Sequence, residues 1–579
     1  MDTVNIKIND IDVAANKNDT ILTAANNVGI NIPTLCYLKD LNEIGACRMC
    51  VVEVKGQKNL VASCVYPVSE GMEIYTNSPL VQKSRKMTLE LILSNHEKKC
   101  LSCVRSTNCE LQKLVNEYGI ENASRFDGEN PHYNLDSSTP HLVRNNNKCI
   151  LCRRCVAACR NQYVSVIGPN GRGFDTHIGC AFEKDLSDVP CVSCGQCIAN
   201  CPTGALRERD DCDEVMNAIN DKSKYVIVHT APSIRVTLGE CFGMPIGSNV
   251  KGKMVTALKM LGFDKVFDTD LGADFTIMEE ATEFANRIKN GGKLPMITSC
   301  SPGWVKFCEY YYPDMIDNLS TCKSPQQMQG ALIKTYYAKK MNLKSDDIIV
   351  VGIMPCTAKK FEITRDAQNA AGVPDTDFVL TTRELARLIK RAGINFTSLK
   401  DSDFDPTLGI SSGAGAIFGA TGGVMEAALR TASDLLTGEP LNKIEYYEVR
   451  GTEGIKEATY SIAGISINVA VVSGLKNAVK VLNSIKTGEK NYHFIEIMCC
   501  PGGCINGGGQ PVQPASVKNF TDLKSLRSNA LYEEDRNLPI RKSHENPILQ
   551  KIYKEYLGAP GSEIAHKILH TGYVKRSKF

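Results

Sequence analysis

Apolar runs alternate with amphipathic stretches in the part of the chain beyond residue 209. The segments 224–233 (KYVIVHTAPS), 293–300 (KLPMITSC) and 346–356 (DDIIVVGIMPC) have the length and apolar content of buried strands. Residues 276–290 (TIMEEATEFANRIKN) instead place apolar side chains at helical spacing. This alternation predicts an α/β region with largely parallel sheets.

Residues that carry chemistry stand at the ends of the predicted strands. Pro232 and Ser233 end the first apolar run, while Cys300 and Cys356 end the second and the third. Ligands of open α/β sheets bind beyond the carboxyl ends of the strands. The pattern therefore predicts a ligand site at these strand ends.

The first 80 residues or so have a different pattern. Three short β-rich pieces, at 3–10, 51–56 and 72–77, accompany one helical stretch at 20–29. Among them lie four cysteines in the arrangement C-x10-C-x2-C-x13-C, which are Cys36, Cys47, Cys50 and Cys64. This spacing suits a [2Fe–2S] cluster, in which each iron binds two cysteine sulfurs. The ligands of zinc sites usually form two closely spaced pairs in the sequence. The arrangement resembles the [2Fe–2S] domain that opens complex-I-like and hydrogenase subunits.

The composition is that of an ordinary globular protein, large enough for several domains. The chain has 579 residues, and its 67 basic and 64 acidic side chains leave a net charge of +3. This near-neutral charge gives no strong positive field that would attract nucleic acid. The sequence has no run of about 18 uncharged apolar residues, so no membrane span is expected. The first residues lack the pattern of a secretory signal, so we expect a cytoplasmic protein.

Cysteine is the exception to this ordinary composition. The chain has 25 cysteines, and most of them are clustered at short fixed spacings. In a reducing compartment such clusters are typical of metal ligands. Buried, inert cysteine is the alternative, and we expect it for isolated residues such as Cys212, Cys241 and Cys308.

A second group of candidate ligands lies between residues 81 and 137. His96 is followed by Cys100, Cys103 and Cys109. Three cysteines and a histidine are typical of zinc when taken alone, and they also suit a [4Fe–4S] cube. The neighbouring iron–sulfur motifs favour the cube, and its imidazole ligand should raise the reduction potential because it removes negative charge.

The pattern C-x2-C-x2-C-x3-C occurs twice between residues 138 and 208, and the second copy ends in Pro202. This internal repeat is the pattern of two-cluster bacterial ferredoxins, in which the fourth cysteine of each copy ligates the other cluster. We therefore expect one cube on Cys149, Cys152, Cys155 and Cys201, and another on Cys191, Cys194, Cys197 and Cys159.

Three long motifs carry a resemblance to a known family. They read TSCSPGW at 298–304, MPCTAKKFE at 354–362 and EIMCCPGGCINGGGQP at 496–511. In this order they resemble the TSCCPxW, MPCxxKxxE and ExMxCxxGCxxGGGQP signatures of the [FeFe]-hydrogenases, and the resemblance covers essentially the whole chain. The accessory cluster motifs are similar to those of the large clostridial-type enzyme and of the catalytic subunit of NAD(P)-linked relatives.

The resemblance implies a fold and a domain order. An α/β H-cluster domain of two lobes with parallel sheets is expected at 209–579. Ahead of it we expect α+β ferredoxin-like domains: a β-grasp [2Fe–2S] domain at 1–80, a His/Cys3 [4Fe–4S] domain at 81–137 and a two-cluster ferredoxin domain at 138–208.

The resemblance also implies an H-cluster, which is a [4Fe–4S] cube joined through a cysteine sulfur to a two-iron unit with CO, cyanide and azadithiolate. By motif, Cys504 would be the bridge, and Cys356 and Cys500 would bind the cube. The glycines around Cys504 would let the backbone approach the inorganic group closely. The other residues that the resemblance assigns to the cofactor are Pro232, Ser233 and Lys359 beside the cyanides, and Met354 and Met498 as packing. A plain core role suits the two methionines equally well.

The first motif departs from the family pattern, which has two adjacent cysteines at this place. Matched without a gap, Cys300 takes the role of proton donor and Ser301 falls where a cube ligand belongs. Alternatively, Cys300 turns to the cube and the proton relay is changed. The absence of an insertion favours the first alignment, and neither alignment gives a role to the additional Cys499.

The family's proton pathway maps onto Cys300, Glu280, Ser320, Glu283 and Arg287. The two glutamates are three residues apart on a predicted helix, so both lie on one face. A buried carboxyl group with a raised pKa could pass protons near neutral pH. Without the motif match, the two glutamates would be interpreted as surface residues of a charged helix, and Cys322, near the expected pathway, receives no role.

The implied reaction is 2H⁺ + 2e⁻ ⇌ H₂. Electrons would enter at the N-terminal clusters from ferredoxin or from a flavoprotein subunit, and dedicated maturation proteins would supply the two-iron unit. Two other functions stay open. One is an H₂ sensor, which is disfavoured by the matched glutamates and by the lack of an added signalling module. The other is an iron–sulfur assembly protein, which is disfavoured by Lys359 and the accessory relay.

Overall fold

The N-terminal part of the computed structural model, which describes residues 2–438, 444–462 and 464–578, is built on a five-stranded sheet. Its strand order is β2-β1-β5-β3-β4; β1 is parallel to β5, and the other neighbours are antiparallel. Buried residues alternate along β1, and helix α1 packs on that buried face. The elements are β1 Thr3–Ile8, β2 Ile11–Asn16, α1 Ile21–Asn27, β3 Val51–Val54, β4 Val61–Ala62 and β5 Glu73–Tyr75.

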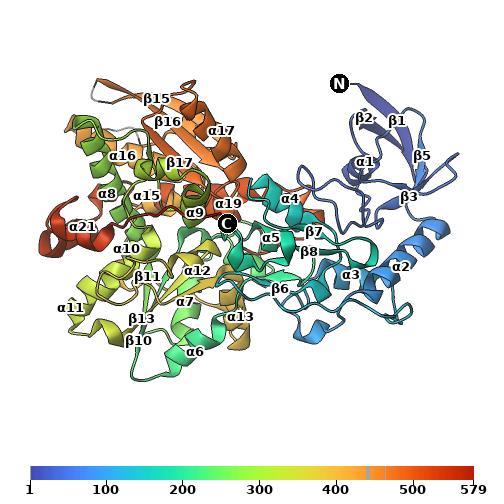
Figure 1. The fold of residues 1–579 in the computed structure, drawn as a ribbon, viewed down its shortest axis with the longest axis horizontal. Helices are drawn as coiled ribbons and strands as arrows, with labels where there is room; N and C mark the ends of the chain where they lie inside the picture. The colour runs from blue at the N-terminus through green and yellow to red at the C-terminus, as the bar shows by residue number, and fades with distance from the viewer. Residues whose placement is uncertain (1, 439–443, 463, 579) are drawn as a thin grey trace.

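Two short accessory regions connect this sheet to the rest of the molecule (Figure 1). In the first, two helices pack through Leu89, Leu93, Leu111 and Leu114. In the second, each of two short helices carries the third cysteine of one repeat, and two small antiparallel strand pairs flank them. The elements are α2 Pro79–Ser94, α3 Glu110–Glu117, β6 Val143–Arg144, α4 Arg154–Asn161, β7 Gly168–Asn170, β8 His177–Gly179, α5 Gln196–Ala199 and β9 Leu206–Arg207.

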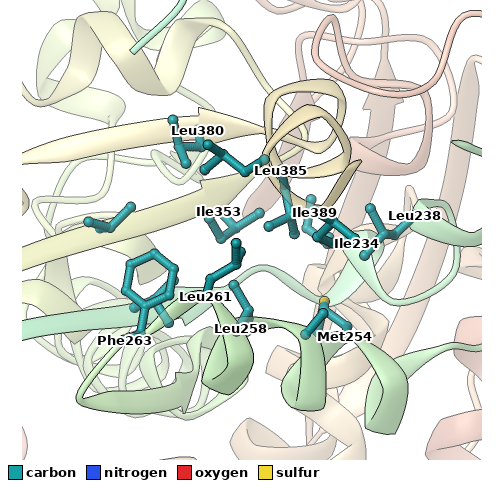
Figure 2. Close-up of a cluster of buried hydrophobic side chains, with 14 of the residues drawn as sticks. Ile234, Leu238, Met254, Leu258, Leu261, Phe263, Ile353, Leu380, Leu385 and Ile389 are labelled. Atoms are coloured by element: carbon teal, nitrogen blue, oxygen red, sulfur yellow. The ribbon is translucent and has the colours of Figure 1, made fainter. Parts of the chain in front are cut away.

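The first lobe of the C-terminal part is a four-stranded, fully parallel sheet in the order β11-β10-β13-β14. This sheet confirms the α/β prediction. Its core packs α7 and α13 against β13, with Leu258, Ile353 and Leu385 at the contact (Figure 2). The elements are α6 Cys212–Asn220, β10 Tyr225–Thr230, α7 Lys251–Leu261, β11 Lys265–Asp268, β13 Ile348–Met354, β14 Phe378–Thr381 and α13 Thr382–Arg391.

The second lobe is a mixed sheet in the order β12-β17-β16-β15, in which only the β15–β16 pair is antiparallel. Helices α9 and α17 cover one face of this sheet, and α8 and α16 cover the other. The sheet is therefore buried on both sides, as parallel strands require. The elements are α8 Thr269–Lys289, β12 Met296–Ile297, α9 Pro302–Tyr311, α16 Gly423–Thr437, β15 Ile455–Ile462, β16 Ile465–Ser473, α17 Leu475–Lys486 and β17 Phe494–Met498.

Smaller helices complete the two lobes. Five of them lie between α9 and α16 along the chain, and these are α10 Pro325–Leu332, α11 Ala338–Met341, α12 Ala358–Glu362, α14 Pro406–Gly409 and α15 Gly413–Ala416. Those after β17 are α18 Ala515–Lys518, α19 Leu523–Asn537, α20 Pro547–Ile552 and α21 Glu563–Leu569. Among the described residues, no helix combines the length and the apolar content that a bilayer crossing needs.

The core of the first lobe gives a direct stability prediction. Leu258 is fully buried on α7, whereas Met260 on the same helix is 57% exposed. Leu258→Ala should destabilise the lobe by about 2–5 kcal/mol, because it leaves a cavity in a packed core. Met260→Ala should change stability by less than about 0.5 kcal/mol. Calorimetric unfolding of the anaerobically purified chain measures both, and equal shifts for the two variants would contradict the packing described.

Candidate functional site

A buried cavity of about 70 Å³ lies where the two lobes meet. Its walls are mostly apolar and include Pro232, Met354, Phe418 and Met498. Five cysteines and one serine also line it, and these are Cys300, Ser301, Cys356, Cys499, Cys500 and Cys504. So many thiols around one cavity point to a metal–sulfur group.

Strand ends from both sheets supply these residues. β10 ends two residues before Pro232, and β13 ends two residues before Cys356. From the second sheet, β12 ends three residues before Cys300, and β17 is followed directly by Cys499 and Cys500. The cavity therefore lies at the carboxyl ends of parallel strands, where ligands of α/β sheets bind.

Lys359 is a buried cation on the cavity wall, on helix α12. Its Nζ lies 3.0 Å from Glu362 Oε2 and donates to the carbonyl oxygen of Cys300 at 3.2 Å. The helical spacing of three residues in the second motif brings these two charges together. The ion pair holds the ammonium group at the cavity, where it can donate to an anionic ligand.

The glycine-rich turn after β17 serves protein packing as much as cofactor approach. Gly503 and Gly507 line the cavity. A Cβ on Gly503, whose φ is +95°, would lie 2.7 Å from the backbone nitrogen of Thr421, and one on Gly508 would meet the backbone of Cys194 and Gly195. Close approach to an inorganic group stays a prediction for these glycines, and the structure adds a second reason for them, because backbone segments of the protein fill the space beside them.

The five residues of the predicted proton pathway lie close together beneath the cavity. Ser320 Oγ donates to Glu283 Oε2 at 3.0 Å, and Arg287 Nη2 donates to Glu283 Oε1 at 2.6 Å. Glu280 stands on the same helix, α8, between this group and the thiol of Cys300, with which it interacts electrostatically. The interpretation of these glutamates as surface residues is wrong for Glu280, which is fully buried.

The charge states along this group are set by burial. Neither carboxylate oxygen of Glu280 has a close, well-aligned hydrogen-bond partner among the described residues, although the Ser320 hydroxyl and the Ser299 backbone lie near enough to oppose the rise of its pKa. Burial, and then repulsion from the Glu283 carboxylate, raises the pKa of Glu280 to about 8, so that group is mostly protonated at neutral pH. Burial also raises the pKa of the Cys300 thiol well above its usual range, with the Glu280 carboxyl as the next cause.

A side branch of this network was missed by the sequence analysis. Thr321 donates to Glu283 Oε2 from its backbone nitrogen at 3.0 Å, and its hydroxyl lies 2.8 Å from His570 Nδ1. His570 Nε2 in turn lies 3.0 Å from the buried Glu279. No sequence signal links residues this far apart. Cys322 lies near the same carboxylate, with its Sγ 3.9 Å from Glu283 Oε2.

The cysteines of the N-terminal domain come together in one place. Cys50 Sγ lies 3.3 Å from Cys64 Sγ, and the backbone nitrogen of Cys47 lies 3.5 Å from Cys36 Sγ. All four thiols are close enough for mutual electrostatic interaction. Four thiols in one place, without a histidine, suit a [2Fe–2S] cluster.

The second predicted ligand group is brought together only in part. Cys103 and Cys109 interact electrostatically, and the backbone nitrogen of Cys103 donates to the carbonyl oxygen of Cys100 at 3.1 Å. Within the described ranges, no hydrogen bond or ion pair joins His96 to the three cysteines. Burial lowers the pKa of His96 to about 4, so its imidazole is neutral, which is the form that binds metal. Cys100 is exposed.

The two ferredoxin repeats exchange their fourth cysteines. A small apolar pocket is lined by Cys149, Cys152, Cys155 and Cys201. The thiols of the other set interact electrostatically, and that set is Cys159, Cys191, Cys194 and Cys197. Of the cysteines expected to be isolated, Cys212 and Cys308 are buried, whereas Cys241 is only partly buried.

The second ferredoxin set lies directly against the cavity. Thr357, next to Cys356, donates to the carbonyl oxygen of Ser193 at 2.8 Å. The thiol of Cys194 interacts with that of Cys499, which lines the cavity. The accessory site and the cavity thus share one wall, which is the arrangement required to pass electrons between them.

The residues around the cavity fit an H-cluster. Thiolates are the usual ligands of iron–sulfur groups, and five thiols are present. Ser233 Oγ and Gln326 Oε1 are buried without a hydrogen-bond partner among the described residues, and Gln326 lines the cavity. Buried polar atoms normally have a partner, so these two atoms are suited to contact a bound group.

Comparisons with known proteins agree with this site. Residues 224–508 match the family described as iron only hydrogenase large subunit, C-terminal domain, and residues 521–576 match the iron hydrogenase small subunit. Ahead of them, three more families match: a 2Fe-2S iron-sulfur cluster binding domain at 1–79, the NADH-ubiquinone oxidoreductase-G iron-sulfur binding region at 85–124 and a 4Fe-4S dicluster domain at 148–205.

Full-length relatives and a solved structure are similar as well. The NADP-reducing hydrogenase subunit HndD of Solidesulfovibrio fructosivorans is 47% identical over 100% of both chains. Iron hydrogenase 1 of Clostridium pasteurianum is 47% identical over 98% of this chain and 100% of its own. The structure of [FeFe]-hydrogenase HydA1 from Chlamydomonas reinhardtii has a TM-score of 0.57 at 39% identity, covering 63% of this chain and 99% of that one.

Proposed function

The chain belongs to the iron-only hydrogenase family, and on that premise we propose which of its residues carry the reaction 2H⁺ + 2e⁻ ⇌ H₂. The enzyme combines an H-cluster domain with accessory [2Fe–2S] and [4Fe–4S] domains. One observation supports the proposal most: five thiols and a lysine surround a buried cavity that shares a wall with a four-cysteine accessory site. The domain boundaries that we propose are 1–80, 81–137, 138–208 and 209–579.

The cavity residues hold the cofactor in this proposal. Cys356 and Cys500 would hold the cube, and Cys504 would serve as the thiolate shared with the two-iron unit. Lys359, held by Glu362, would donate to an anionic ligand of that unit. Pro232 on the cavity wall and Ser233 directly after it, whose buried hydroxyl has no partner among the described residues, would contact the same unit. Met354 and Met498 exclude water. When bound, the H-cluster supplies the iron at which H₂ forms or splits.

Protons reach the cavity along α8 in this proposal. Arg287 and Glu283 are the outermost of the five groups, with side chains 13% and 15% exposed. Ser320 connects Glu283 inward, and Glu280, with its pKa of about 8, holds a proton at neutral pH. The buried thiol of Cys300 is the last donor before the cofactor, since its raised pKa keeps it protonated.

Electrons would travel through the accessory sites to Cys194 and across the shared wall. We propose a ferredoxin or a flavoprotein as the external partner. The relative HndD is named as a subunit of an NADP-reducing hydrogenase, which supports the flavoprotein. Maturation proteins would load the two-iron unit, and we propose a cytoplasmic location because this chemistry needs reduced thiols.

Infrared spectroscopy and turnover test the proposal together. Protein produced anaerobically with maturation proteins should show bands of bound CO and cyanide and should evolve H₂ from a reduced dye. Bands without turnover would favour an H₂ sensor. Protein that binds iron but shows neither bands nor turnover would contradict the proposed function.

A further inference from the structure

A [4Fe–4S] cube takes four protein ligands, and the motifs of this chain supply only three for the H-cluster cube. These are Cys356, Cys500 and Cys504, while Ser301 stands at the fourth place. A serine would have to lose a far less acidic proton than a thiol does, so it is a poor substitute. The following inference rests on the proposed function, since it concerns that cube.

Ser301 is already engaged with the backbone in this structure. Its Oγ accepts a hydrogen bond from the backbone nitrogen of Cys499 at 3.1 Å. This contact joins the start of α9 to the residue that follows β17. Ser301 therefore fixes the position of Cys499 and leaves the fourth ligand place to another side chain.

Cys499 has the position that a ligand needs. It is 3% exposed and lines the same cavity as the three motif cysteines. Its thiol interacts with those of Cys500 and Cys194. Consecutive side chains of a strand point to opposite faces, but the chain bends at 499 and 500, so both can serve one site.

Space for this sulfur is provided by a glycine. A Cβ on Gly303 would lie 2.8 Å from Cys499 Sγ, closer than van der Waals contact allows. The first motif thus contributes two features that position Cys499: Ser301 accepts a hydrogen bond from its backbone, and Gly303 leaves room for its sulfur. Within the described residues, five cysteines line the cavity, and four remain when Cys300 serves as the proton donor.

We propose that Cys499 is the fourth ligand of the H-cluster cube and that Ser301 is its positioning residue. On binding iron, the Cys499 thiol loses its proton to solvent and forms an iron–thiolate bond. Compared with the family motif, the fourth ligand has moved from the start of α9 to the residue after β17, and the cube would keep four thiolates. This arrangement gives a role to Ser301, by which the chain departs from the family motif, and to the additional Cys499.

Iron and acid-labile sulfide counts test the assignment without any use of turnover. Full-length protein is made without maturation proteins, so that the two-iron unit is not loaded. Cys499→Ala should lose about four irons and four sulfides per chain, which is one cube. Ser301→Ala should keep them. Cys308→Ala is the matched control: it removes a buried thiol on α9 that does not line the cavity, and it should also keep the irons and sulfides.

A rescue variant separates ligation from folding. Ser301→Cys in the Cys499→Ala background should regain the four irons, because it restores a thiol at the family's usual place. Three outcomes overturn the proposal: Cys499→Ala keeps its iron, Ser301→Ala loses the same four irons, or the double variant is not rescued. Failure of the proposed function would be seen separately, because that proposal is tested by infrared bands and H₂ turnover of matured protein and not by iron counts.

Discussion

Glu280→Gln is expected to lower H₂ turnover by about 10²–10⁴-fold, the range typical of a lost proton-transfer group. Glu280 is fully buried between Cys300 and the Ser320–Glu283 pair, and an amide in its place cannot release and regain a proton. The infrared bands of the matured variant should be unchanged, because Glu280 does not line the cavity. Dye-linked H₂ evolution measures the loss.

The same substitution on the surface is the control. Glu489→Gln changes an exposed glutamate in the turn after α17 and should leave turnover unchanged. Full activity in Glu280→Gln would show that protons use another route.

The pKa of Glu280 also predicts a pH dependence of stability. The folded protein keeps this carboxyl group protonated up to pH of about 8, whereas the unfolded chain releases the proton near its ordinary value of 4.5. Between these values the folded state binds more protons, so stability falls as pH rises, by up to roughly 1.4 kcal/mol per pH unit. Unfolding midpoints at pH 6 and pH 9 should therefore differ less in Glu280→Gln than in the wild type. Equal differences would contradict the raised pKa.

Arg235→Met is expected to destabilise the first lobe by about 3–5 kcal/mol, the cost of removing one partner from a buried ion pair. Arg235 is 1% exposed, and its guanidinium group lies 2.7 Å from Asp268, 3.0 Å from Asp270 and 2.9 Å from Glu534. Without it, three buried carboxylates face one another, and among the described residues Lys251 is the one cation left to pair with Glu534. Because Arg235 follows Pro232–Ile234 directly, this wall of the cavity should also shift.

An exposed ion pair of the same lobe is the control. Arg391 pairs with Asp213 at 2.7 Å, and both side chains are more than half exposed. Arg391→Met should change stability by less than about 1 kcal/mol, since solvent screens such pairs. Calorimetry of the two variants compares them, and similar losses would contradict the role given to burial.

The strand pattern of the first lobe could be predicted because buried parallel strands are continuous apolar runs. The runs at 224–233 and 346–356 contain β10 and β13. The run at 293–300 yields only a two-residue strand, β12, because the chain leaves the sheet to place its last residues at the cavity. The hairpin of β15 and β16 was not predicted, since its exposed face breaks the apolar run.

The site could be anticipated only where ligands are close in sequence. Spacing alone pointed to the clusters, and the three motifs pointed to one cavity. Contacts between distant segments, such as Thr321 with His570 or Ser301 with Cys499, depend on the packing of separate elements and leave no periodic signal. The burial that raises the pKa of Glu280 was expected from the motif match and not from its own helix.

The close approach of Gly195 to Gly508 and Thr357 limits how this enzyme could be re-engineered. A side chain at either glycine would push the ferredoxin module away from the catalytic lobes, and electron tunnelling weakens steeply as the gap widens. A foreign ferredoxin module that replaces residues 138–208 must therefore keep a glycine at position 195. The N-terminal sheet, which lies to one side of the two lobes, is the better place to exchange the redox input (Figure 1).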